Sequence, residues 1–174
     1  MTKTRCRTAM VAATIVIGAG TQPAQAQDAL TRIRPMGALL ASSVEDAMAR
    51  SSTFRELIAI INMSDGIVYV AEGDCGHGTR ACLAAVTAAG RDRILYVNVS
   101  TRRSRLDLIA SIGHELQHAV EVLSVPGIRS TAAMHLFYQR VSRTTGRFET
   151  TAAMRAGEAV RRDIQQSMRA AQVP

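Results

Sequence analysis

The sequence predicts an α+β fold in which a small antiparallel or mixed sheet packs on a central helix and further helices follow. Three observations support this class. Two short β-type runs lie near the middle of the chain, a long apolar helix follows the second run, and helical patterns continue almost to the end. We therefore expect one domain over residues 42–174, preceded by a flexible leader over 27–41.

The first expected element of the domain is a helix. Ser42 and Glu45 have the spacing of a capping box, and apolar residues recur behind them at helical spacing as far as about Asn62. Asp65 and Gly66 then favour a turn. The pattern predicts one continuous helix that ends before this turn.

Two strands and three helices are expected after the turn. Ile67–Ala71 predicts the first strand and Ile94–Val99 the second, because both are rich in β-branched residues. Between them we expect a cysteine-containing loop and a short Ala-rich segment. The helices are expected over 105–123, over about 130–141 with Ser130 as the capping residue, and from a break at Thr144–Gly146 to about Ala171.

The first 26 residues have the pattern of a secretory signal peptide. Three basic residues precede an apolar run over 9–20, and Ala24–Ala26 forms an A-x-A cleavage site. The run is too short to span a bilayer. Cys6 precedes the run instead of following it, which argues against a lipoprotein anchor. We expect cleavage after Ala26, a secreted or periplasmic mature protein and no stable membrane anchor.

Length and charge fit a small exported domain. Cleavage after Ala26 leaves 174 − 26 = 148 residues, enough chain for one domain with a true core. It also removes three positive charges, so the formal net charge falls from +7 to +4. Three Phe, three Tyr and no Trp argue against a surface on which nucleic-acid bases stack. We therefore expect no nucleic-acid partner.

Two cysteines remain in the expected mature chain. Cys75 and Cys82 enclose a short Gly-rich loop, and in an oxidising compartment such a pair favours a disulfide. The alternative is a metal knuckle that uses both cysteines and His77. Three ligands at that spacing match no common structural zinc pattern, so the disulfide is the preferred interpretation.

The stretch His114-Glu115-Leu116-Gln117-His118 is the most informative part of the chain. Residues four apart on a helix lie on one face, so both imidazoles can converge on one metal ion. Glu115, about 100° around the helix, would stand beside that ion and not bind it. The alternative is a pair of structural histidines, but two histidines and a carboxylate in an apolar helix need a partner, and a metal ion satisfies all three.

The segment Ile112–Ala119 resembles the active-site helix of the zincin metallopeptidases. The metzincin extension is absent, because Glu121 and Ser124 stand where that subgroup has Gly and His. The remaining pattern is similar to the gluzincins, in which a later helix supplies a glutamate ligand. The resemblance implies a Zn²⁺-dependent enzyme acting on a peptide or protein substrate, with Glu115 as the general base for a zinc-activated water. It also implies that strand 94–99 is the edge strand along which an extended peptide lies.

Four downstream residues are candidates for the third metal ligand: Glu121, His135, Glu149 and Glu158. Glu149 is favoured, because we expect it to open the last helix next to small residues that allow close packing; the alternative role is a first-turn acid. Glu158 is the reserve. Glu121 lies about 10 Å along the helix from His114 and is expected either to support a ligand or to lie at the surface. His135 or Tyr138 is expected to hydrogen-bond the oxyanion that develops during catalysis.

Two other interpretations remain open. The first is a non-catalytic exported zinc-binding or interaction domain that keeps the helix for stability. Glu115 distinguishes this domain from an enzyme, since a structural zinc site prefers closed coordination by four protein ligands and needs no unligated carboxylate. The second concerns the metal, because two histidines and one carboxylate also suit iron or manganese.

Overall fold

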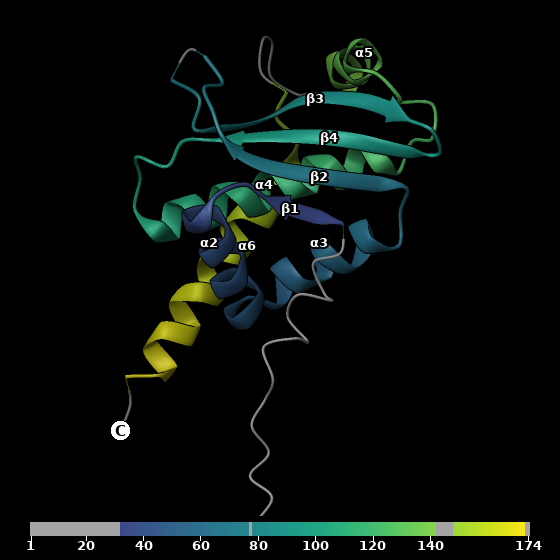
Figure 1. The fold of residues 1–174 in the computed structure, drawn as a ribbon. Helices are drawn as coiled ribbons and strands as arrows, with labels where there is room; N and C mark the ends of the chain where they lie inside the picture. The colour runs from purple at the N-terminus through teal and green to yellow at the C-terminus, as the bar shows by residue number, and fades with distance from the viewer. Residues whose placement is uncertain (1–31, 77, 142–147, 173–174) are drawn as a thin grey trace, which may run out of the picture.

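The computed structural model describes residues 32–76, 78–141 and 148–172. Their fold is α+β, with helices packed on a small mixed sheet, as the sequence predicts (Figure 1). The expected signal peptide and the Thr144–Gly146 break lie outside the described residues. In chain order the elements are β1 (Ile33–Pro35), α2 (Ala38–Arg50), α3 (Ser52–Asn62), β2 (Gly66–Glu72), β3 (Ala81–Ala89), β4 (Asp92–Val99), α4 (Arg105–Leu123), α5 (Thr131–Val141) and α6 (Thr151–Ala170).

The sheet has four strands in the order β1-β2-β4-β3. β1 and β2 are parallel, as are β2 and β4, whereas β3 runs antiparallel to β4. The β3–β4 hairpin turns at Gly90, whose φ of 60° is a left-handed conformation that glycine adopts without steric cost. The register shifts between Leu83 and Ala85, which marks a bulge in β3. β3 is thus an edge strand, and it is the edge that faces α5.

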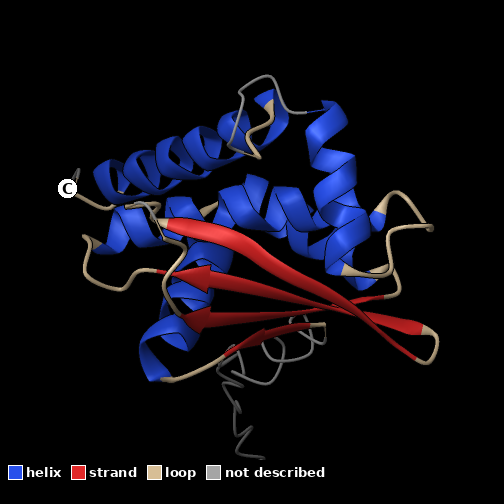
Figure 2. Cartoon of the chain, turned by 90° about the horizontal axis from the view of Figure 1, so that it is seen from above, coloured by secondary structure: helices blue, strands red, loops and turns tan. Residues whose placement is uncertain are grey.

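The helices lie on one face of the sheet, with α4 between the sheet and α6 (Figure 2). α4 buries an apolar face against β2, β3 and β4 because Leu108, Ile112 and Leu116 recur at helical spacing and are almost wholly excluded from solvent. Its contact with α6 is close. A Cβ atom at Gly157 would lie 3.1 Å from the Cβ of His114, so any larger residue would push the two helices slightly apart at this point.

Arg93 of β4 fixes the C-terminal end of α4. It is 2% exposed, and its guanidinium donates to both carboxylate oxygens of Asp65. It also donates to four backbone carbonyls in the last turn of α4 and in the segment that follows it. These hydrogen bonds, 2.8 to 3.2 Å long, reach the carbonyl oxygens of Val122, Leu123, Val125 and Ile128.

The expected helix from Ser42 to Asn62 is wrong in two respects. It is two helices, because Ser51 leaves the helical conformation and its side chain accepts a hydrogen bond from the Phe54 N–H, which starts α3. Ser42 does not cap either of them. Its hydroxyl donates to the carbonyl of Leu39, inside α2, so the capping-box prediction fails.

Two strands occur where none was expected. The segment predicted as a flexible leader contains β1 and the start of α2. The Ala-rich segment after the cysteines is the nine-residue strand β3. Because β3 covers the outer side of β4, strand 94–99 is internal, and the prediction that it forms the edge beside the active helix is wrong.

The other elements agree with the prediction. β2 and β4 include the expected runs, and α4 has the expected bounds. α5 begins after Ser130, whose hydroxyl accepts the Ala133 N–H as a cap. α6 extends to Ala170. Within the described part of the chain, no helix is both long enough and apolar enough to cross a membrane.

Candidate metal centre

His114 and His118 lie one turn apart on the pocket side of α4. Their ring centroids are 4.9 Å apart. The His118 ring is also held by a second group, since its Nδ1 contacts Glu121 at 2.9 Å. Metal-binding histidines are commonly oriented in this way through the nitrogen that does not bind the ion.

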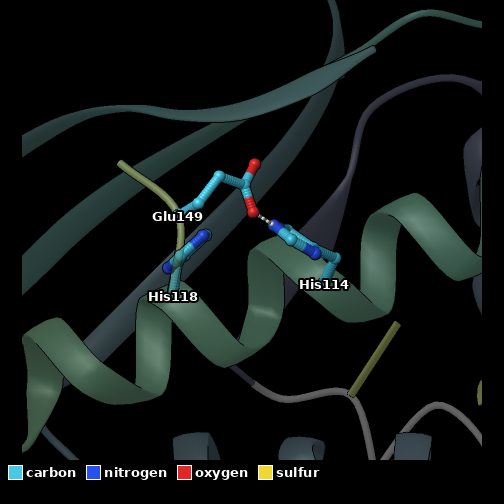
Figure 3. A group of neighbouring side chains, drawn as sticks. All are labelled: His114, His118 and Glu149. Carbon is cyan, nitrogen blue, oxygen red and sulfur yellow. Dashed lines mark ion pairs between the residues drawn. The ribbon is translucent and has the colours of Figure 1, made fainter. Parts of the chain in front are cut away.

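Glu149 completes a group of three potential ligands. One atom from each of Glu149, His114 and His118 lies within 4.8 Å of the others, and the three side chains point toward one another (Figure 3). The Nε2 of His114 is 3.4 Å from the Oε2 of Glu149. Two ligands at about 2.1 Å from a tetrahedral zinc ion are themselves about 3.4 Å apart, so this pair already has the required separation.

The expected position of Glu149 needs a correction. It does not open the last helix but precedes it, because Thr150 is the N-cap and α6 begins at Thr151. Glu158 lies two turns into α6, where its exposed side chain pairs with Arg162 at 3.8 Å. The structure therefore brings Glu149, and not the reserve candidate, next to the two histidines.

Glu115 stands beside this group without belonging to it. It is 4% exposed, and its Oε1 lies 3.9 Å from the Nε2 of His114. Burial raises the pKa of Glu115 to about 7, despite a hydrogen bond from the backbone of Leu83 in β3 that favours the charged form. Near neutral pH this carboxyl group can both take up and release a proton.

The two histidines have different electrostatic surroundings. Burial and the neighbouring His118 lower the pKa of His114. Burial also opposes charge on His118, but the hydrogen bond to Glu121 and the nearby carboxylates outweigh it and raise the pKa of His118. The effect on Glu121 is reciprocal. Burial acts to raise its pKa, yet hydrogen bonds from its neighbours hold that pKa below its ordinary value.

Tyr138 and His135 occupy different positions on α5. Tyr138 is 1% exposed, and its hydroxyl contacts the carbonyl oxygen of His118 at 3.1 Å and the Oε2 of Glu121 at 3.3 Å. Its hydroxyl is thus engaged behind His118. His135 is exposed and stacks on Phe148 with centroids 5.1 Å apart. Of the two, only His135 presents an exposed ring beside the site.

A pocket of about 1010 Å³ opens over the three candidate ligands. One wall is the start of β3, Ala81–Ala84, together with the disulfide loop before it, and the other is formed by α5 and α6. The sequence did not indicate this wall, because an Ala-rich segment has little β propensity. The volume is at the upper end of the range for small-molecule sites and leaves room for several peptide residues.

The cysteine pair forms the expected disulfide. Cys75 and Cys82 are bonded, with their Cα atoms 5.9 Å apart. Since each sulfur is bonded to the other, the alternative metal knuckle is ruled out for this state of the protein. His77, the third member of that knuckle, lies outside the described residues.

Comparison of this chain with models of known protein families, with curated proteins and with solved structures found no match. Its function is therefore inferred from the geometry and chemistry of the site.

Proposed function

We propose that this protein is a secreted zinc-dependent metallopeptidase that hydrolyses peptide bonds. The observation that supports this most strongly is the convergence of His114, His118 and Glu149 within 4.8 Å, with Glu115 buried beside them. Two imidazoles and one carboxylate are the donor set of many catalytic zinc sites, which keep a fourth position open. A purely structural site would use four protein ligands and would have no role for Glu115.

In this proposal, His114, His118 and Glu149 hold the ion. A bound zinc ion supplies a Lewis acid, which polarises a carbonyl group and lowers the pKa of water. Glu115 removes a proton from water as the water oxygen bonds to the carbonyl carbon of the substrate. The same carboxyl group then gives that proton to the departing amine nitrogen as the C–N bond breaks.

The substrate is an extended peptide that lies along β3. This strand is at the edge of the sheet, and its first residues form a wall of the pocket. The far half of the same edge is covered, because Thr131 exchanges hydrogen bonds with Val86. The role of the edge strand that aligns a peptide, which the resemblance to zincins implies, is therefore assigned to β3 in place of strand 94–99. His135 is the remaining candidate for contact with the oxyanion, since the hydroxyl of Tyr138 is directed to Glu121.

Export is part of this proposal. The disulfide between Cys75 and Cys82 fits an oxidising compartment, and it lies in the wall of the pocket. The signal peptide expected over residues 1–26 would deliver the chain there.

Peptide hydrolysis by the Glu115→Gln variant, compared with wild type, tests the proposed mechanism. Zinc-loaded wild type and variant are incubated with a peptide library, and products are identified by mass spectrometry. Glutamine keeps the shape of the side chain but cannot act as a base, so cleavage should fall at least about 100-fold while zinc content stays the same.

Two outcomes would contradict this mechanism. If both proteins cleave equally, Glu115 is not the base. If wild type binds zinc yet cleaves no peptide with zinc, iron or manganese, the non-catalytic binding domain is the better description.

Ligand assignment is tested separately by zinc retention during dialysis. Glu149→Gln should lose zinc because it removes a charged ligand, whereas Glu158→Gln should retain it. The two variants change the same charge on the wall of the same pocket, so each serves as the other's control. Loss of zinc from Glu158→Gln alone would reverse the assignment.

A further inference from the structure

Glu121 lies at the junction of three elements that surround the candidate metal centre. It is on α4, one turn after His118, and its side chain is 14% exposed. Both carboxylate oxygens accept hydrogen bonds. Oε2 contacts His118 and the Tyr138 hydroxyl of α5, and Oε1 accepts from the Thr150 hydroxyl at 2.5 Å. A charge pair three residues apart on a helix is ordinary, but the convergence of donors from α5 and from the start of α6 is not.

The bond to His118 determines which ring nitrogen is available. With Nδ1–H donated to Glu121 at 2.9 Å, the lone pair of His118 is on Nε2, the nitrogen on the opposite side of the ring. The Tyr138 hydroxyl, which contacts both the His118 carbonyl and Glu121, ties the same turn of α4 to α5.

The bond to Thr150 determines where the third ligand stands. Thr150 is the N-cap of α6, and its hydroxyl accepts the Ala153 N–H while donating to Glu121. Glu149 is its neighbour in the chain. Hydrogen bonds thus connect Glu121 with His118 and with the residue that follows Glu149.

We propose that Glu121 is a positioning residue that couples His118 to Glu149, so that the metal site forms as one unit; this rests on the metal site of the proposed function. Without Glu121, the His118 ring is free to rotate and the Thr150 hydroxyl no longer ties the start of α6 to α4. The site then loses both the orientation of one ligand and the placement of another.

Zinc affinity tests this role by competition with a chromogenic chelator on the full mature chain. Glu121→Gln should weaken zinc binding about 10- to 100-fold, the usual effect of losing a hydrogen-bond partner of a ligand. Asp107→Asn is the matched control. Asp107 is also an acid of α4 that binds α6, through Arg161 at 2.6 Å, but it contacts none of the three candidate ligands. The zinc affinity of the Asp107→Asn variant should equal that of wild type.

A double-mutant cycle separates coupling from general weakening. If Glu121 acts through Thr150, Glu121→Gln combined with Thr150→Val should lose less affinity than the product of the two single losses. Thr150→Ser keeps the hydroxyl and should restore wild-type affinity. Should Glu121→Gln fail to fold, Thr150→Val and Thr150→Ser still provide the comparison.

The possible failures are distinguishable. If wild type binds no zinc, the proposed function and this inference both fail. If His118→Ala abolishes zinc binding but Glu121→Gln binds as wild type does, only the positioning role is overturned. Strict multiplication of the Glu121 and Thr150 effects would also overturn the coupling.

Discussion

Arg93 of β4, which packs on the end of α4, and Glu115 of α4 are both buried ionisable residues, but their surroundings differ. Arg93, at the end of the helix, is 2% exposed and has a carboxylate and four carbonyl oxygens as acceptors. Glu115, in the middle of the helix, is 4% exposed, and burial raises its pKa to about 7. Because these acceptors compensate for the burial of its charge, Arg93 has a structural role. The burial of Glu115 is compensated only in part, which lowers the stability of the fold but leaves the carboxyl group able to exchange protons.

The comparison predicts opposite effects on stability when each charge is removed. Arg93→Met should lower the free energy of unfolding by about 3 to 5 kcal/mol, because Asp65 loses its ion-pair partner and the carbonyls in and after the last turn of α4 lose the hydrogen bonds from the guanidinium. Chemical denaturation of the metal-free protein measures this. A loss below about 1 kcal/mol would show that water replaces the guanidinium and that Arg93 is not the anchor of α4.

Glu115→Gln should instead stabilise the metal-free protein. The pKa of Glu115 rises from an ordinary 4.5 to about 7 on folding, so the folded state is penalised for deprotonation. The penalty is absent below about pH 4, grows between the two pKa values and is complete above pH 7, where it reaches at most about 3 kcal/mol. Denaturation of wild type and variant at pH 5 and pH 8 tests this. Glu158→Gln, an exposed control, should show no such change, and destabilisation of Glu115→Gln at pH 8 would contradict the comparison.

Asp65→Asn should have the smallest effect of the three. The Arg93 hydrogen bonds hold the pKa of Asp65 below its ordinary value, so its contribution is present above about pH 4 and is lost as the pH falls through the lower, folded value. At pH 7 the substitution should cost about 1 to 2 kcal/mol, since asparagine still accepts one hydrogen bond. Asp92→Asn, which disrupts a more exposed ion pair with Arg32, should cost less than about 1 kcal/mol. Equal losses in the two variants would mean that Asp65 contributes no more than a surface charge.

The sequence predicts the elements whose signal is local. The apolar repeat of α4 with its two histidines, the β-branched runs of β2 and β4, and the Ser130 cap each depend on neighbouring residues. β1 and β3 depend on distant partners. β1 has only three residues and is fixed by pairing with β2, and the alanines of β3 become a strand because β4 and the disulfide hold them there.

The same distinction applies to the candidate site. The spacing of His114 and His118 is enough to place both on one face of α4. The sequence also favours Glu149 but assigns it to the helix; Thr150, a residue type that helices favour as N-cap, was the local signal that the helix begins after Glu149. The contacts of Glu121 with Thr150 and Tyr138 join residues 29 and 17 positions apart. Such contacts follow from tertiary packing and have no local sequence signal.

A crystal structure of the zinc-loaded mature protein tests the central claim most directly. We predict one zinc ion bound by the Nε2 atoms of His114 and His118 and by one oxygen of Glu149, each at about 2.0 to 2.2 Å, with Glu115 near the ion but outside its coordination. A zinc ion coordinated by Glu115, or one bound without Glu149, would contradict the proposed site.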